Sequence, residues 1–79
     1  MGLYYFDVYN SDGMTLDEEG QEFPDLDRAM NLAVASVRSI LSEEVKAGTI
    51  NLRGRVEIRH DGTAVATLQF GDAVTVIQG

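Results

Sequence analysis

Residues 3–9 are rich in aromatic and β-branched side chains, which are typical of a β-strand. The turn sequence Asn-Ser-Asp-Gly follows at 10–13, and we expect a short second strand from Met14 to about Asp17. A second pair of strands is predicted near the other end, at about 54–59 and 63–70, with Gly62 in the turn between them. The chain therefore begins and ends with a β-hairpin.

The apolar pattern suggests a register for the second hairpin. A three-residue loop over 60–62 pairs Ile58 with Ala64 and gives one face that is entirely apolar. A two-residue loop would instead place Leu68 on the same face as Arg55. We therefore predict a type I turn closed by a glycine bulge, and the same loop type in the first hairpin.

A long amphipathic helix is predicted between the hairpins, from Leu26 to Ala47. Asp25 is in position to cap its first turn, and Gly48 suits the residue that follows its last turn. The apolar residues recur at steps of three and four and form one stripe: Leu26, Ala29, Met30, Ala33, Val37, Ile40, Leu41 and Val45. The helix is about 33 Å long, which is enough to cross a four-stranded sheet.

These elements predict a single α+β domain over residues 1–79, a two-layer ββαββ sandwich with one long helix packed on a four-stranded antiparallel sheet. The apolar residues of the strands would face the helix: Tyr4, Phe6, Val8, Val56, Ile58, Ala66, Leu68 and Phe70. The tail, 71–79, resumes with apolar residues and is predicted to form an edge strand or a packed extension. No element is left to cover the other face of the sheet.

The composition is that of a folded globular chain, with 79 residues that are 44% hydrophobic and 24% charged. There is no cysteine, which excludes disulfides, thiolate metal sites and cysteine nucleophiles. The longest uninterrupted apolar run, 32–35, is too short for a membrane span or the core of a signal peptide. We therefore expect a cytoplasmic protein with no membrane partner.

Catalytic chemistry finds little support in the sequence. The one histidine, His60, falls in the predicted turn, where we interpret it as solvated, and no serine lies in an activated-nucleophile motif. The glycines are scattered at turns and caps, without the spacing of a phosphate-binding loop. We expect no enzymatic activity and no cofactor.

The acidic residues are concentrated in the first third of the chain. Residues 1–27 carry eight carboxylates and no base, whereas 28–79 have a net charge of +1. The predicted register of the first hairpin brings Asp7 opposite Asp17, a repulsive pair unless something neutralises it. Three outcomes are open: the second strand ends at Leu16, an arginine lies alongside, or a cation binds, with Asp7, Asp17 and Glu19 as weak candidate ligands.

The uncovered face of the predicted sheet carries three arginines and two tyrosines: Arg53, Arg55, Arg59, Tyr5 and Tyr9. Arginines beside exposed aromatic rings are typical of proteins that bind single-stranded nucleic acid. A net charge of −7 opposes that function, since the domain would repel a phosphate backbone. We therefore favour an internal charge network in which the arginines balance Asp7, Glu57 and the acidic segment.

Tyrosine and arginine are also enriched at protein interfaces. Together with Val65, these five residues are therefore candidates for binding a protein partner. The leading hypothesis is a small non-enzymatic protein-interaction domain that forms a homodimer through the open sheet face or a sheet edge. Binding of nucleic acid is the less favoured alternative.

Two resemblances accompany these patterns. The aromatic strand 4–8 and the segment Asp-Glu-Glu-Gly-Gln-Glu-Phe-Pro-Asp-Leu at 17–26 resemble a family of short bacterial proteins classed as a domain of unknown function. That resemblance implies a bacterial cytoplasmic setting and no known activity, ligand or catalytic residue. The Pro-Asp-Leu sequence at 24–26 also resembles the start of the helix in the amino-terminal domain of HicB-type antitoxins, which implies an acidic partner for a basic toxin.

Overall fold

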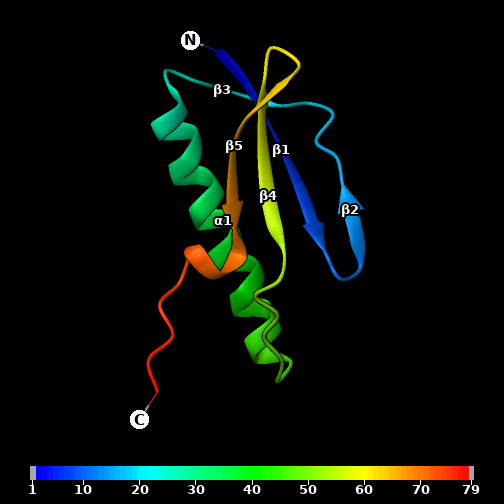
Figure 1. Cartoon of the computed structure of the whole chain (residues 1–79), viewed down its shortest axis with the longest axis vertical. Coiled ribbons are helices and arrows are strands. Elements are labelled where there is room, and N and C mark those ends of the chain that lie inside the picture. The colour runs from blue at the N-terminus through cyan, green and yellow to red at the C-terminus, as the bar shows by residue number, and fades with distance from the viewer. Residues whose placement is uncertain (1, 79) are drawn as a thin grey trace.

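One helix lies across one face of an antiparallel sheet in the computed structural model, which describes residues 2–78 (Figure 1). The elements are β1 (Gly2–Asn10), β2 (Gly13–Thr15), β3 (Gln21–Phe23), α1 (Leu26–Lys46), β4 (Arg55–His60), β5 (Thr63–Gln69) and the 3₁₀ turn η1 (Phe70–Asp72). The strand order is β2-β1-β4-β5, and β3 also pairs with β1. This arrangement confirms the predicted α+β class and the single helix on an antiparallel sheet.

The ends of α1 follow from its capping residues. The side chain of Asp25 accepts a hydrogen bond from the backbone N–H of Arg28 at 2.9 Å, as expected of an N-cap. The helix ends at Lys46 with Ala47 as its C-cap, and Gly48 follows with a positive φ of 91°. Both predicted caps are confirmed.

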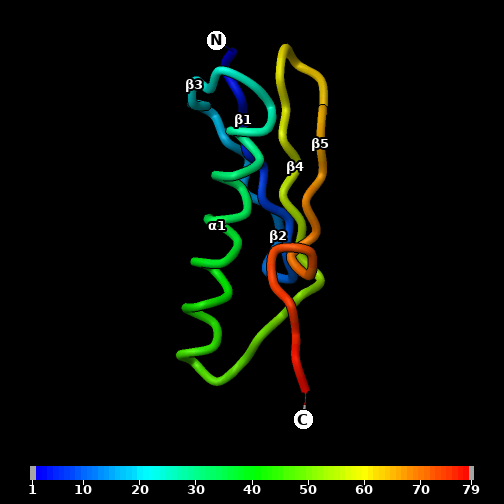
Figure 2. The backbone as a smooth tube through the Cα atoms, turned by 90° about the vertical axis from the view of Figure 1, so that its left-hand side faces the viewer, coloured from blue at the N-terminus to red at the C-terminus, as the bar shows by residue number. Residues whose placement is uncertain are grey.

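The core lies between α1 and the sheet. It consists mainly of small helical residues packed on larger residues of the strands and of η1: Tyr4, Ala29, Ala33, Val37, Leu41, Val56, Ile58, Leu68, Phe70 and Ala73. Val45 was predicted to belong to this stripe but is 57% exposed. The last turns of α1 extend beyond the end of the sheet, so Val45 has no strand to cover it (Figures 1 and 2).

The second hairpin is closed by a two-residue turn, not by the predicted three-residue loop. Asp61 and Gly62 have positive φ values of 54° and 74°, and His60 pairs with Thr63 as the last residue of β4. The register shifts at Val65, where β5 contains one extra residue, a β-bulge. Beyond the bulge, Ile58 pairs with Ala66, so the apolar residues reach the predicted face through a different register.

The first hairpin also differs from the prediction, because Asn10 pairs with Gly13 across a two-residue turn. Val8 therefore pairs with Thr15 and not with Leu16. The apolar pattern carried no register information here, since β2 is the strand farthest from α1 and Met14 is 63% exposed (Figure 1). The prediction also missed β3, which pairs with the opposite end of β1 on the same side as β2.

Of the two forms predicted for the tail, the described residues 71–78 show the packed extension and no edge strand. After η1, Ala73 is buried and accepts a hydrogen bond at its carbonyl from Nε of Arg38, at 2.7 Å. Phe70 fills the space above Gly54, where a Cβ atom would lie 2.6 Å from Cε2 of the ring. Gly54 is therefore required for close packing, whereas Ile77 further along the tail is 88% exposed.

Candidate functional site

Three residue pairs lie directly opposite each other on the outer face of β1 and β4. Tyr5 pairs with Arg59 and Tyr9 pairs with Arg55, with one acidic pair between them. The guanidinium carbon of Arg55 lies 4.2 Å from the centre of the Tyr9 ring, and that of Arg59 lies 4.9 Å from the Tyr5 ring. Both arginines therefore make cation–π contacts within the domain.

Asp7 is the buried charge of this face, with a side chain only 3% exposed. Arg59 donates to it from Nε and from Nη2, the latter to Oδ1 at 3.1 Å, and the backbone N–H of Asp17 donates to Oδ1 at 2.9 Å. The bonds from Arg59 outweigh burial and hold the pKa of Asp7 below its ordinary value. Asp7 in turn raises the pKa of Arg59.

Arg55 also pairs with a carboxylate, since its Nε lies 3.3 Å from Oε1 of Glu57. The Glu57 side chain is more exposed than that of Asp7, at 29%. The predicted internal charge network is therefore confirmed for Arg55 and for Arg59. Asp7 and Glu57 lie directly opposite each other and would repel. Arg59 neutralises Asp7 and Arg55 neutralises Glu57, which relieves that repulsion.

Asp17 fixes the acidic segment against the sheet. Its carboxylate accepts hydrogen bonds from the backbone N–H groups of Phe6, Glu19 and Gly20, each at 3.1 Å. Burial opposes ionisation of Asp17, but these three donors outweigh it and hold its pKa below the ordinary value. Arg59 also donates to the Asp17 carbonyl at 3.0 Å, which ties the segment to β4.

This segment covers part of the face that was predicted to be bare, since Gly20 lies against the ring of Tyr5. The repulsion expected between Asp7 and Asp17 is relieved in two of the predicted ways: β2 ends before Asp17, and an arginine lies alongside. Among residues 2–78, no group of three or more histidine or acidic side chains is placed to hold a metal ion. Glu19, one of the candidate cation ligands, contacts Asp17 through its backbone N–H.

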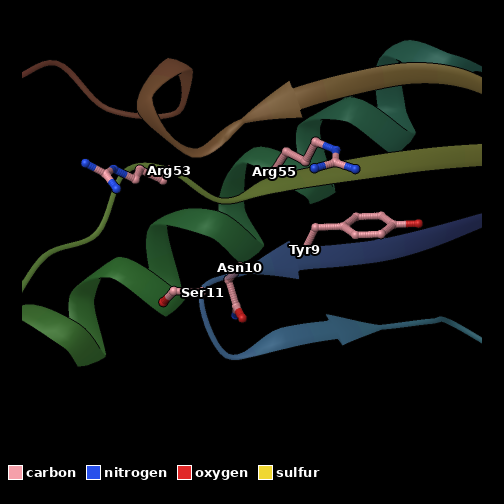
Figure 3. Close-up of a pocket in the computed structure, with 5 residues that line it drawn as sticks. All are labelled: Tyr9, Asn10, Ser11, Arg53 and Arg55. Atoms are coloured by element: carbon pink, nitrogen blue, oxygen red, sulfur yellow. The ribbon is translucent and has the colours of Figure 1, made fainter.

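A pocket of about 330 Å³ opens between the β1–β2 turn and the beginning of β4 (Figure 3). It is lined by Tyr9, Asn10, Ser11, Arg53 and Arg55. Three of the predicted interface residues thus meet here, although Arg53 precedes β4 and was expected within the strand. Asn10 and Ser11 were not predicted as site residues, because their position beside Arg53 depends on the pairing of β1 with β4.

The remaining predicted residues lie apart from this pocket. Tyr5 and Arg59 belong to the network around Asp7, and Val65, 40% exposed, is the bulge residue of β5. His60 was interpreted as a solvated turn residue, but its ring stacks on Tyr4 with centroids 4.5 Å apart. The Nδ1 atom of His60 lies 2.9 Å from the Leu3 carbonyl oxygen, which indicates a structural role.

A family model described as a domain of unknown function (DUF6894) matches residues 3–71, which is most of the chain. The chain belongs to this family. Neither the curated proteins nor the solved structures that were searched contain a match. Within residues 2–78, α1 is not apolar enough over a sufficient length to span a membrane.

Proposed function

We propose that this domain is a non-enzymatic protein-interaction module that forms a homodimer by pairing β5 of one copy with β5 of another. The observation that carries the proposal is the chemistry of this edge strand. Residues 63–69 contain no charged residue and no proline, and β5 has a neighbouring strand on one side only. Long uncharged edges are the ones that other strands pair with, and natural proteins usually protect them.

The opposite edge of the sheet shows what such protection looks like. There β2 and β3 have three residues each, and the acidic segment lies between them. Short edge strands and charged side chains both discourage pairing with another chain. The two edges thus differ, which favours β5 as the contact surface.

Electrostatic repulsion between two copies is smallest where they meet through β5. A net charge of −7 opposes most contacts between copies, but β5 contributes no charge of its own. Antiparallel pairing of identical strands gives a closed two-fold dimer in which no like charges on β5 oppose each other. The bulge at Val65 leaves 66–69 as the regular part of the strand for this contact.

The exposed surface of the domain is consistent with a dimer. It amounts to 5431 Å², whereas a folded monomer of this size exposes about 4,700 Å². The tail accounts for part of this excess surface, since Val76 is 59% exposed. On β5 itself, Val65 is 40% exposed. A specific dimer typically buries about 800 Å² on each partner.

Light scattering on a sizing column, over a range of protein concentrations and at two salt levels, tests the proposal. We expect a dimer for the unmodified chain and a monomer for Thr67→Lys. Thr67 is exposed in the domain, so the new lysine is solvated in the monomer and the fold should be retained, whereas a second β5 strand alongside would have to cover the charge. Thr49→Lys is the matched control, with the same change of charge at an exposed position outside the strands.

A monomer at every concentration would overturn the proposal. A dimer that persists in Thr67→Lys would overturn the assignment to β5, and loss of that dimer in Tyr9→Ala would place the contact on the outer face. If Thr49→Lys dissociates as readily as Thr67→Lys, charge alone controls association and the edge is not the interface.

Single-stranded nucleic acid is the alternative ligand of the outer face. The three pocket residues Tyr9, Arg53 and Arg55 support it, whereas the engagement of Arg55 and Arg59 with carboxylates speaks against it. Titration with a labelled oligonucleotide at low salt distinguishes the two functions. A bacterial cytoplasmic setting also forms part of the proposal: the absence of cysteine supports a reducing compartment, and the resemblance of 4–8 and 17–26 to short bacterial proteins supports the bacterial origin.

A further inference from the structure

We infer that the pocket between the β1–β2 turn and the beginning of β4 binds a small oxyanion, the phosphate or carboxylate group of a larger ligand. This inference is independent of the proposed dimer, because the pocket is not formed by β5. It rests on the hydrogen-bonding groups that line the pocket and on the charges that they carry.

The two arginines of the pocket retain donors without protein partners. Within residues 2–78, the side chain of Arg55 makes one hydrogen bond, from Nε to Glu57, so both of its Nη groups are free to donate. The side chain of Arg53 makes no hydrogen bond or ion pair with any of the described residues 2–78. Its backbone N–H donates to Oδ1 of Asn51. A guanidinium group presents five N–H donors in a fork that matches phosphate and carboxylate oxygens.

Asn10, the last residue of β1, and Ser11, in the following turn, carry further donors; in Figure 3 the Asn10 side chain points away from both guanidinium groups and must turn to share a ligand with them. Oδ1 of Asn10 accepts the backbone N–H of Asp12 at 2.9 Å, which leaves the side-chain NH₂ of Asn10 as the free group. Oγ of Ser11 accepts from Nδ2 of Asn51 at 3.0 Å, so the hydroxyl hydrogen can be donated elsewhere. Each of these two oxygens already accepts one hydrogen bond, whereas the hydrogen bonds among the described residues use neither the amide donors of Asn10 nor the hydroxyl donor of Ser11.

Among residues 2–78, the lining of the pocket carries one positive charge that no carboxylate pairs with, that of Arg53, because Arg55 is paired with Glu57. The chain has thirteen acidic and six basic residues, yet the pocket is lined by two arginines and no carboxylate. A concave site with several donors and a local positive charge attracts anions even when the net charge is negative. The chemistry of the lining therefore selects an oxyanion over a cation or a neutral amide.

The shape of the pocket indicates a ligand larger than the anion itself. Its volume of about 330 Å³ is at the lower end of the range for small-molecule sites, about 300–1,000 Å³. Tyr9 also lines the pocket, with its ring stacked on the guanidinium group of Arg55. The guanidinium groups of Arg53 and Arg55 point away from each other in Figure 3, so binding requires the exposed Arg53 to turn inward. Ordering this side chain opposes binding, and we expect about millimolar affinity for a bare ion.

Titration of the ¹⁵N-labelled full chain, followed by NMR, tests the inference. Inorganic phosphate and acetate are added separately, against sodium chloride at matched ionic strength. We expect saturable shifts confined to residues 9–11 and 53–55, and at least a tenfold loss of affinity in Arg53→Gln and in Arg55→Gln. Arg28→Gln is the matched control, because Arg28 is exposed on α1 outside the pocket.

The two ions distinguish the ligand classes. Tighter binding of phosphate identifies a phosphorylated ligand, and tighter binding of acetate identifies a carboxylate. Non-saturating shifts equal to those caused by chloride would overturn the inference, as would unchanged affinity in both pocket variants. Repeating the titration with Thr67→Lys keeps this result separate from the oligomeric state.

Discussion

Replacement of Asp7 by Asn is the most informative test of how the two hairpins are held together. The change preserves size but removes the charge, and it places an NH₂ group against donors of Arg59 and of the Asp17 backbone. Loss of one member of a buried ion pair typically costs about 3–5 kcal/mol. The side chain of Arg59 is 33% exposed and can be rehydrated, so we expect a loss of about 2–3 kcal/mol.

Such a loss is large for this domain. A chain of this size has a free energy of unfolding of about 4–12 kcal/mol, and small domains have urea m-values of about 1 kcal/mol/M. Urea unfolding at pH 7, followed by circular dichroism, should therefore show the midpoint falling by about 2 M. Glu57→Gln provides the control, because Glu57 lies directly opposite Asp7 but its side chain is 29% exposed.

For that exposed pair we expect a change of at most about 1 kcal/mol. A loss below about 0.5 kcal/mol in Asp7→Asn would refute the claim that the buried carboxylate joins β1 to β4. Equal losses in the two variants would also refute it, since burial would then have no energetic consequence.

Two further predictions concern acid stability and packing. Folding lowers the pKa values of Asp7 and Asp17 below the ordinary value of 3.8, so the unfolded chain binds more protons in acid. The two carboxylates therefore stabilise the fold fully well above pH 3.8, and this stabilisation is lost as the pH falls below that value. Acid titration of the unfolding free energy should show this loss, and Asp7→Asn should make it shallower; an equal slope in the variant would contradict the assignment. Gly54→Ala should destabilise the domain by about 1–3 kcal/mol, because the alanine Cβ would lie 2.6 Å from the Phe70 ring. Gly71→Ala serves as the control in the same urea assay, because the alanine Cβ there would make only ordinary contacts at 3.9 Å, with Leu52. Equal stability of the two alanine variants would contradict the role of Gly54.

The helix could be predicted from the sequence because its information is local. The apolar stripe and the caps at Asp25 and Gly48 lie within the segment that they define. Val45 was wrongly predicted to be buried, because the sequence of the helix does not show where the sheet beneath it ends.

The register of the second hairpin was wrong for a different reason. Alternation of apolar residues specifies which face a side chain occupies, and a shift of two positions leaves that face unchanged. A two-residue turn at Asp61 and Gly62 combined with a bulge at Val65 therefore satisfies the same pattern as the predicted three-residue loop. Pairs such as Ile58 with Ala66 can be distinguished only by the packing of the folded sheet.

The polar network around Asp7 could be predicted only in part. The sequence placed Asp7 and Arg59 on one face and raised the possibility of an arginine beside the acidic pair. It could not show that the Asp17 backbone closes over Asp7, nor that the pocket gathers Asn10 and Ser11 next to Arg53. These contacts join segments far apart in the chain, and their geometry follows from the order of the strands.

The central position of β1 and β4 also governs how the chain can fold. These strands are the inner pair of the sheet, and the ion pair that links them joins residues 52 positions apart. Closing a loop of that length costs roughly 3.5 kcal/mol of chain entropy before the contact contributes. Each hairpin alone is marginal, so neither half offers a stable intermediate on which the other could assemble. Folding of this domain should therefore be a single cooperative step, with its rate set by the encounter of β1 and β4.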